Sequence, residues 1–268
     1  MQKKLPLGIF DSGFGGLSVA KNIHELLPHE DLVYIADSAF TPYGDMKESD
    51  IIKRALLISD FLVNKKKSKA IVIACNTATA FAVNVLRDKF SIPIIGMEPA
   101  VKPALKVTLN KKVGVLATSG TSKSAKFSAL LERYSGDVKF FVQPCPGLVN
   151  AIEKGNFNDE ELFELLQKYL DNFKKNRVDT IVLGCTHFVY IKHLVKKIMG
   201  ANIKIVDTSD AVARQLRAKL DQFNLRSNSS EPQEKMKLIL TKHKNIPQVV
   251  DQFLSGSNIS FKIERSWH

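Results

Sequence analysis

Two stretches of the chain decide the fold, Ala70-Ile-Val-Ile-Ala-Cys75-Asn-Thr-Ala78 and Thr180-Ile-Val-Leu-Gly-Cys185-Thr-His187. Each has a short apolar run, then a cysteine, then small polar residues that lead into a helical pattern. Short apolar runs between helical patterns are typical of buried parallel strands. Open α/β sheets bind ligands at the carboxyl ends of such strands. We therefore predict that the two thiols lie at equivalent strand ends of two matched halves and face one small molecule.

Predicted strands and helices alternate along most of the chain. The expected strands are Leu7–Phe10, Leu32–Ala36, Ala70–Ala74, Ile92–Ile95, Lys112–Leu116, Val138–Val142, Thr180–Leu183, Ile203–Val206, Met236–Thr241 and Ile259–Ile263. The clearest helical patterns are Ser49–Val63, Thr77–Phe90, Glu160–Lys174 and Ser209–Phe223. This alternation predicts an α/β fold of parallel βαβ units with helices on both faces. A weak repeat, in which Gly8–Gly13 resembles Gly114–Gly120, supports two similar halves.

Size and composition indicate a globular chain with a sizeable core. Its 268 residues are 44% hydrophobic and 25% charged, enough for one large domain or two smaller ones. No apolar run approaches the ~20 residues of a membrane-spanning helix, and the first apolar stretch is too short for a signal peptide. Three cysteines without the spacing of a disulfide framework indicate reduced thiols. We therefore expect a cytoplasmic protein.

The net charge of +12 suggests an anionic partner, which would be nucleic acid, a membrane surface or a small anion. The lysine runs, such as Lys65-Lys66-Lys67 and Lys196-Lys197, have no interleaved aromatic residues. They fall in loops or at predicted helix ends, where the helix dipole favours cations. We therefore expect a solvated basic surface, with no nucleic-acid and no membrane partner.

Cys75 and Cys185 are the candidate reactive groups. A single cysteine is usually an inert buried side chain, but two in matching contexts indicate chemistry. A helix N-terminus stabilises a thiolate, so we expect pKa values lowered from ~8.5 towards neutrality. His187 follows Cys185 by two positions and could stabilise a thiolate, move its proton, or be an ordinary core histidine. These three side chains could also hold zinc, but no Cys-x-x-Cys pair supports a metal site.

A glycine-rich turn, Asp11-Ser-Gly-Phe-Gly-Gly16, follows the first predicted strand. It is an incomplete dinucleotide fingerprint, because Ser18 stands where the third glycine is required, and NAD is not expected. Two interpretations remain: a tight turn before a helix, or a helix N-terminus that meets an anion, with Asp11 and Ser12 as polar contacts.

Three other features have plainer interpretations. Asp37–Gly44 is a loop in which Pro42 restricts the backbone and Gly44 permits close approach to a ligand, although an ordinary turn explains it equally well. Glu153 lies on a short predicted helix, where a surface position is the default. Cys145 lies between two prolines without the strand-then-helix context, so we expect it to serve packing or loop chemistry and not catalysis.

Taken together, four motifs resemble glutamate racemases of the cofactor-independent aspartate/glutamate racemase superfamily. They are Asp11-Ser-Gly13, Pro42-Tyr-Gly44, Ala74-Cys-Asn-Thr-Ala78 and Gly184-Cys-Thr-His187. The resemblance rests on the order and spacing of the motifs and extends to about Leu220. It implies two Rossmann-like α/β domains related by pseudo-two-fold symmetry, with the active site in the interdomain cleft. The first domain would be 1–97 plus 208–268, and the second 98–207.

The resemblance also implies roles for residues. Cys75 and Cys185 would be the two acid/base thiols, assisted by Asp11, His187 and, as a weaker match, Glu153. The implied substrate contacts are Asp11, Ser12, Pro42, Tyr43, Gly44, Asn76, Thr77, Thr118, Thr121, Thr186 and His187. One thiolate would remove the α-proton of glutamate while the other thiol protonates the opposite face, with Cys75 acting on D-glutamate and Cys185 on L-glutamate.

The implied function is interconversion of L- and D-glutamate to supply D-glutamate for peptidoglycan, without metal or other cofactor, in a family where homodimers are common. Two departures affect local loops: Phe188-Val-Tyr190 follows the Cys-Thr-His motif, and Phe40-Thr41 stands where an arginine often precedes Pro-Tyr-Gly. Three alternatives stay open: a racemase of aspartate or another acidic amino acid, a non-catalytic two-domain binding protein, and a zinc or nucleic-acid protein.

Overall fold

The computed structural model describes residues 2–136, 138–233, 235–242, 246–257 and 259–264. Their strands form two separate sheets, one of six strands in the order β10-β9-β2-β1-β3-β4 and one of four in the order β6-β5-β7-β8. Neighbouring strands run parallel throughout both sheets in this part of the chain. The predicted α/β class with parallel strands is confirmed.

The first sheet consists of β1 (Leu7–Asp11), β2 (Leu32–Ala36), β3 (Ala70–Ile73), β4 (Ile94–Ile95), β9 (Lys235–Leu240) and β10 (Ser260–Glu264). The second consists of β5 (Lys112–Ala117), β6 (Lys139–Pro144), β7 (Thr180–Gly184) and β8 (Lys204–Val206). Each predicted strand is confirmed to within about two residues at either end. Differences of two residues occur at the end of β6 and at the start of β4. Strand β4 begins after Pro93, because proline has no N–H to contribute to the ladder.

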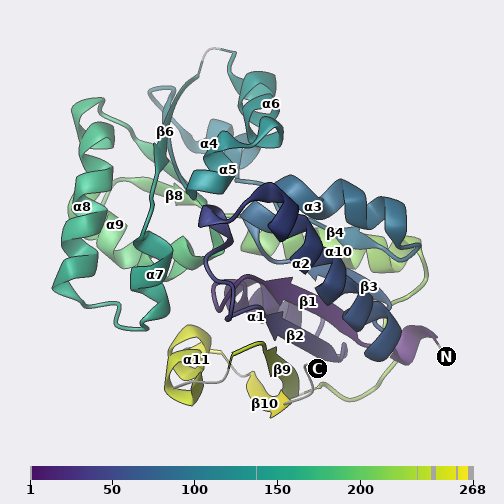
Figure 1. Ribbon diagram of the computed structural model, residues 1–268. Helices are drawn as coiled ribbons and strands as arrows, with labels where there is room; N and C mark the ends of the chain where they lie inside the picture. Colours follow the sequence, from purple (N-terminus) through teal and green to yellow (C-terminus); the bar gives the residue numbers. More distant parts are fainter. Residues whose placement is uncertain (1, 137, 234, 243–245, 258, 265–268) are drawn as a thin grey trace.

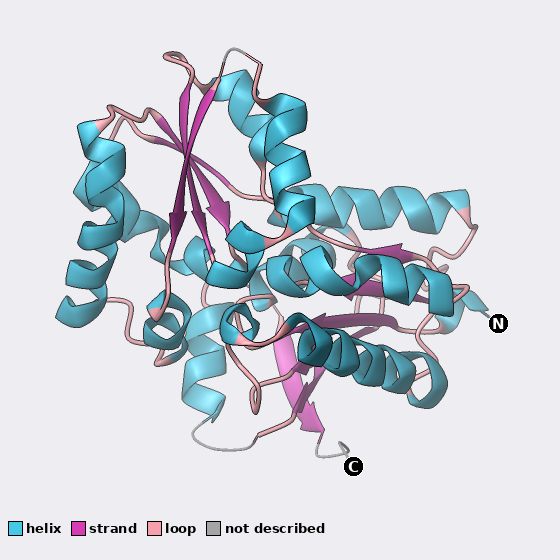
Figure 2. Cartoon of the chain, turned by 45° about the horizontal axis from the view of Figure 1, so that its top comes forward, coloured by secondary structure: helices cyan, strands magenta, loops and turns pink. Residues whose placement is uncertain are grey.

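The α-helices are α1 (Leu17–Leu26), α2 (Glu48–Asp60), α3 (Asn76–Lys89), α4 (Val101–Val107), α5 (Ser119–Lys123), α6 (Ala125–Tyr134), α7 (Leu148–Glu153), α8 (Glu160–Lys175), α9 (Lys192–Met199), α10 (Ser209–Gln222) and α11 (Ile246–Leu254). Shorter 3₁₀ or π segments are η1 (Gln2–Lys4), η2 (Tyr43–Asp45), η3 (Phe61–Lys65) and η4 (Thr186–Ile191). Helices cover both faces of each sheet (Figure 2).

Side chains alternate between the two faces of the first sheet, as a strand requires. On β1, Leu7 and Ile9 pack with α1 on one face, whereas Phe10 joins the cluster that includes α2 and α3 on the other. The cluster around α1 continues into the second half of the molecule, where it includes Leu183 of β7. The apolar core therefore connects the two sheets as well as filling each of them.

The chain passes from the first sheet to the second after β4 and returns through α10, which lies beside α1 (Figure 1). The two sheets therefore follow the predicted order of the two halves. The boundaries 1–97 plus 208–268 and 98–207 stay a prediction, and residues 265–268 of the first lie outside the described part of the chain.

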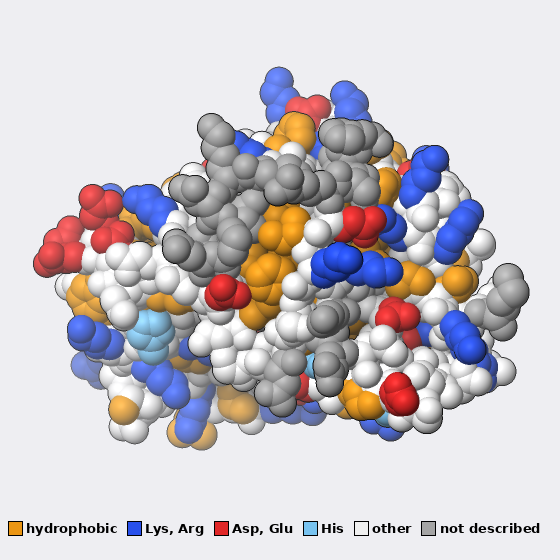
Figure 3. All heavy atoms as spheres, turned by 90° about the horizontal axis from the view of Figure 1, so that it is seen from below, with side chains coloured by type: hydrophobic (Ala, Val, Ile, Leu, Met, Phe, Trp, Pro, Cys, Tyr) orange, Lys and Arg blue, Asp and Glu red, His pale blue; other side chains and the backbone are white. Residues whose placement is uncertain are grey.

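Lysine and arginine side chains are spread over the face shown in Figure 3 and do not merge into one basic patch there. Several lysines of the runs in the sequence lie in the last turns of helices, as expected. They include Lys174 and Lys175 on α8 and Lys196 and Lys197 on α9. None of the helices in the described ranges has the length and apolar character that a bilayer crossing requires.

Candidate active site

Cys75 lies at the carboxyl end of β3 and caps helix α3. Its Sγ accepts a hydrogen bond from the N–H of Ala78 at 3.4 Å, and the residue is only 5% exposed. Burial, followed by the charge of Asp11, raises the pKa of this thiol well above its usual range, and the bond from Ala78 opposes the rise. The expected lowering of the Cys75 pKa is therefore wrong for this state of the molecule, because desolvation outweighs the helix N-terminus.

Asp11 ends β1 and is completely buried beside Cys75. Its carboxylate accepts hydrogen bonds from the N–H groups of Ser12 at 2.7 Å and Gly16 at 2.8 Å, and from the hydroxyl of Thr186 at 3.5 Å. Burial raises the pKa of Asp11, although the charge of His187 and the amides oppose the rise. Asp11 lies close enough to Cys75 for its charge to raise the pKa of the thiol, so a buried carboxyl group lies beside the first thiol.

Cys185 follows β7 and has a different proton partner. Its Sγ lies 3.7 Å from Nδ1 of His187, and Nε2 of the same ring lies 2.5 Å from Oε1 of Glu153. Burial alone would lower the pKa of His187, but the hydrogen bonds to Cys185 and Glu153 outweigh it and raise that pKa well above its usual range. The three side chains form a thiol–imidazole–carboxylate series that favours a protonated imidazole.

Glu153 was expected on the surface, and that interpretation is wrong. Its side chain is only 12% exposed, and besides pairing with His187 it accepts a hydrogen bond from the N–H of Phe14 at 2.8 Å. Helix α7 thus brings a carboxylate from the second half to the glycine-rich turn of the first. Glu153, the weaker match of the resemblance, therefore lies beside the His187 and Cys185 side chains.

Three N–H groups of the glycine-rich turn donate to carboxylates of the protein itself. Those of Ser12 and Gly16 donate to Asp11, and that of Phe14 donates to Glu153. The N–H of Gly15 lies 3.2 Å from Nε2 of His187, which could accept it only when that nitrogen carries no proton. Two of the protein's own carboxylates therefore meet this turn, and an external anion at the turn stays a prediction.

Three hydroxyl groups connect the two halves on the other side of Cys75. Oγ1 of Thr77 lies 2.8 Å from Oγ1 of Thr118 and 3.2 Å from Oγ1 of Thr121, which are themselves 3.0 Å apart. Thr118 follows β5 and caps α5. Gly44 touches Thr118, since a Cβ on this glycine would lie 2.7 Å from the Cβ of Thr118.

Among the described residues, none is a hydrogen-bond partner for the side-chain amide of Asn76, next to Cys75. Its Oδ1 and Nδ2 are both buried and neither makes a hydrogen bond within the described ranges. The Oγ1 of Thr41 is unpartnered in the same sense. Buried polar groups in native proteins nearly always have a partner, so Asn76 indicates a polar ligand at this position.

The two thiol groups lie close enough for a charge on Cys185 to raise the pKa of Cys75. The structure thus brings Asp11, Ser12, Tyr43, Gly44, Asn76, Thr77, Thr118, Thr121, Glu153, Thr186 and His187 to the carboxyl ends of the two sheets around Cys75 and Cys185. Pro42 directly precedes the short segment η2, which carries Tyr43 and Gly44.

Comparison with known proteins identifies the family. The family model for Asp/Glu/hydantoin racemases matches residues 8–216. A glutamate racemase from Ectopseudomonas mendocina (strain ymp) is 48% identical over 225 residues, which are 84% of this chain and 85% of that protein. The chain belongs to the glutamate racemase family.

Two solved glutamate racemases share the whole fold. An isoform from Bacillus anthracis has a TM-score of 0.85 at 29% identity and covers 98% of both chains. The enzyme from Francisella tularensis, solved in complex with D-glutamate, has a TM-score of 0.84 at 29% identity and covers 98% of this chain and 97% of its own. The fold common to glutamate racemases therefore includes β9, α11 and β10, which lie beyond the matched range of the family model.

Sequence reasoning did not find Phe253, on helix α11. The centroid of its ring lies 4.3 Å from the ring centroid of Tyr190 and 5.4 Å from that of Phe157. The ring centroid of His187 lies 6.4 Å away, in an edge-to-face arrangement. The C-terminal segment of this family member thus packs behind the imidazole. No motif marks it, because a single phenylalanine in an apolar helix has no distinguishing pattern.

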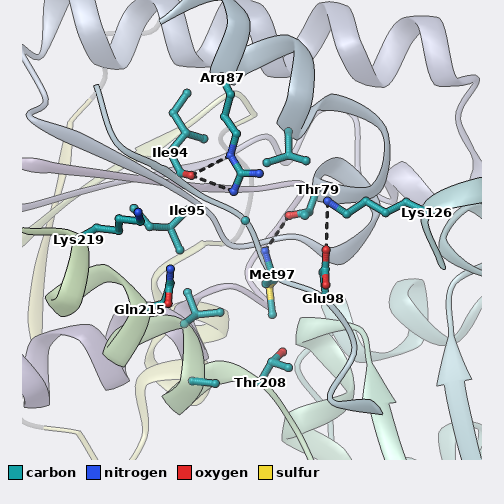
Figure 4. A pocket seen from close by; sticks show the side chains of 14 residues that line it. Thr79, Arg87, Ile94, Ile95, Met97, Glu98, Lys126, Thr208, Gln215 and Lys219 are labelled. Carbon is teal, nitrogen blue, oxygen red and sulfur yellow. Dashed lines mark hydrogen bonds and ion pairs between the residues drawn. The ribbon is translucent and has the colours of Figure 1, made fainter. Parts of the chain in front are cut away.

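A separate cavity lies away from the thiols, beside β4 and the first turns of α10. It has a volume of about 310 Å³ and carries Arg87, Lys126 and Lys219 among its lining side chains. Figure 4 shows Arg87 bonded to the carbonyl of Ile94 and Lys126 paired with Glu98.

Among the residues described, no group of three or more His, Cys, Asp or Glu side chains could hold a metal ion.

Proposed function

We propose that the protein interconverts L- and D-glutamate by proton transfer at the α-carbon, with Cys75 and Cys185 as the two acid/base groups. The observation that carries the proposal is the matched placement of the two thiols at the carboxyl ends of β3 and β7, each with its own proton partner. Asp11 serves Cys75 and His187 serves Cys185. Two separate proton relays are what a reaction at two faces of one carbon requires.

The chemistry is a paired proton transfer. One thiolate removes the α-proton, and the opposite thiol delivers a proton to the other face. The raised pKa of Cys75 supports a protonated Cys75, which acts as acid while Cys185 acts as base. That direction converts L- to D-glutamate, and the reverse direction exchanges the two roles.

The α-proton is very weakly acidic, so negative charge that develops on the substrate carboxylate must be stabilised. The unpartnered amide of Asn76 and the hydroxyls of Thr77, Thr118 and Thr121 are suited to hold carboxylate oxygens. Burial of both thiols supports a reaction that runs in a site closed to water. We also propose that 1–97 plus 208–268 and 98–207 move apart to admit the substrate.

The Francisella tularensis relative was solved with D-glutamate, which supports an acidic amino acid as substrate here. We propose D-glutamate for peptidoglycan as the physiological product and the cytoplasm as the place of action. A second copy of the chain is proposed as the partner on family grounds alone.

Deuterium uptake tests the mechanism. The purified chain, treated with chelator, is incubated with L-glutamate or D-glutamate in D₂O, with D-aspartate as the alternative substrate. We expect deuterium at the α-carbon of the product enantiomer, because the delivering thiol exchanges with solvent. Racemisation that requires added metal or pyridoxal phosphate, or turnover of aspartate in preference to glutamate, contradicts the proposal.

A further inference from the structure

Arg54 lies in the middle of helix α2 and points to the carboxyl end of β2. Its Nε and one terminal nitrogen bind the two oxygens of Asp37 at 2.8 and 2.7 Å. The Asp37 side chain is completely buried and that of Arg54 is 15% exposed. A bidentate pair of this kind fixes the orientation of both groups as well as their separation.

Asp37 also fixes the loop that carries Tyr43. The hydroxyl of Tyr43 donates to Oδ2 of Asp37 at 2.5 Å, and Tyr43 is only 1% exposed. One carboxylate therefore holds a helix on one side and the start of η2 on the other. Without Arg54, the carboxylate of Asp37 would be a buried charge that keeps the neutral hydroxyl of Tyr43 as its donor from the loop.

The loop held in this way borders the reactive groups. Gly44, next to Tyr43, touches Thr118, and a Cβ on Gly120 would lie 3.1 Å from the carbonyl oxygen of Gly44. Tyr43 is close enough to Cys75 for the two groups to interact electrostatically. A shift of this loop by a fraction of an ångström would therefore change the wall beside Cys75 and the hydroxyl group of Thr118.

The ring of Phe40, in the loop that follows Asp37, packs over the guanidinium of Arg54. The guanidinium carbon of Arg54 lies 4.1 Å from the centre of the Phe40 ring, within cation–π distance. Phe40 stands two residues before Pro42 and has no charge to give to Asp37. Arg54 supplies that charge from α2, and the aromatic ring covers the guanidinium.

We propose that Arg54 is a positioning residue for catalysis, which acts through Asp37 to hold Tyr43 and Gly44 at the substrate. The proposal rests on the proposed function, since it assumes that this loop contacts glutamate. It predicts that loss of Arg54 weakens substrate binding more than it slows the chemical step, because the cysteines and their proton partners are untouched.

The experiment measures KM and kcat with D-glutamate for the full chain and for Arg54→Met, Arg54→Lys and Asp37→Asn. Lys53→Met is the matched control, because Lys53 is an exposed cation on the same helix. We expect Arg54→Met to raise KM by about tenfold with a smaller change in kcat. Arg54→Lys should raise KM less, because lysine keeps the charge but cannot form the two parallel hydrogen bonds of the guanidinium. Lys53→Met is expected to match the wild type.

The double variant Asp37→Asn/Arg54→Met keeps the test valid if the single variant folds poorly, because it removes both buried charges. If Arg54 acts through Asp37, the double variant has about the KM of the single ones, not the product of their effects. A lowered Tm with unchanged KM in Arg54→Met, or effects that multiply in the double variant, overturns the inference. An inactive wild type overturns the proposed function itself and is recognised by that result alone.

Discussion

A Cβ atom on Gly15 would lie 2.4 Å from Nδ1 of His187, closer than any real side chain approaches. Gly15 belongs to the turn after β1, and His187 to η4 of the other half. The contact shows that the glycine is required by what faces it across the site, because no positive φ is recorded at this position. Its absent side chain leaves the room that the imidazole occupies.

Gly15→Ala is therefore expected to displace His187 and to lower kcat by about 10- to 100-fold, the range in which misplaced catalytic groups fall. Steady-state kinetics and the Tm of the same sample separate this effect from unfolding. A variant with normal kcat would show that the ring tolerates displacement.

Cys75→Ser and Cys185→Ser are each expected to lower racemase turnover by at least ~10²-fold, because a hydroxyl is a far weaker acid than a thiol. Cys145→Ser is the matched control. Cys145 is also buried and follows a strand of the second sheet, but its thiol donates to the carbonyl of Gln143 at 3.2 Å, and no titratable side chain among the described residues is hydrogen-bonded to it. We expect it to keep wild-type turnover within about twofold. Circular-dichroism progress curves measure all three, and equal losses in all three would contradict a special role for the pair.

Glu153→Gln is expected to lower the pKa of His187, because the carboxylate is one of the groups that raise it. The alkaline limb of the pH profile of kcat/KM should then move to lower pH.

The pairing of His187 with Glu153 also affects stability. The contribution of His187 to the free energy of unfolding is fully present below the unfolded pKa of ~6.5 and is lost as pH rises through the folded pKa. The stability lost in the variant should therefore be largest at low pH and shrink as pH rises. Urea unfolding at several pH values measures this, and a difference that grows with pH would contradict it.

Lys69→Met tests a site remote from the thiols. Lys69 and Glu30 form an ion pair at 2.5 Å with side chains only 1% and 2% exposed. Removing the lysine leaves a buried carboxylate and is expected to cost about 3–5 kcal/mol, whereas Lys69→Met/Glu30→Gln should recover most of it. Arg217→Met, in an exposed pair with Asp221, should cost less than about 1 kcal/mol. Urea unfolding gives the values, and kinetic constants should not change in any of the three.

Much of the fold could be predicted because parallel strands have short apolar runs with clear ends. Cys75 and Cys185 were found for the same reason, since each follows such a run. The position of Glu153 could not be predicted, because it depends on how α7 of one half meets the turn of the other. Hydrophobic periodicity shows which face of a helix or strand is buried, and it gives no information on contacts between the two halves.

The electrostatics of the site were the hardest part to predict. A helix N-terminus can be recognised from sequence, but the burial that raises the pKa of Cys75 is a property of the assembled molecule. The pairing of Arg54 with Asp37 had no signal either, because an arginine within a helix most often faces solvent. Sequence motifs identified the candidate reacting groups, and the folded chain determines their environment.

Both sulfurs are shielded, with Cys75 and Cys185 exposed to only 5% and 7%. A neutral alkylating reagent such as iodoacetamide can therefore reach them only when the molecule opens. The rate at which the thiols are labelled would then report the rate of that opening. Bound glutamate should lower the labelling rate, because it prolongs the closed state.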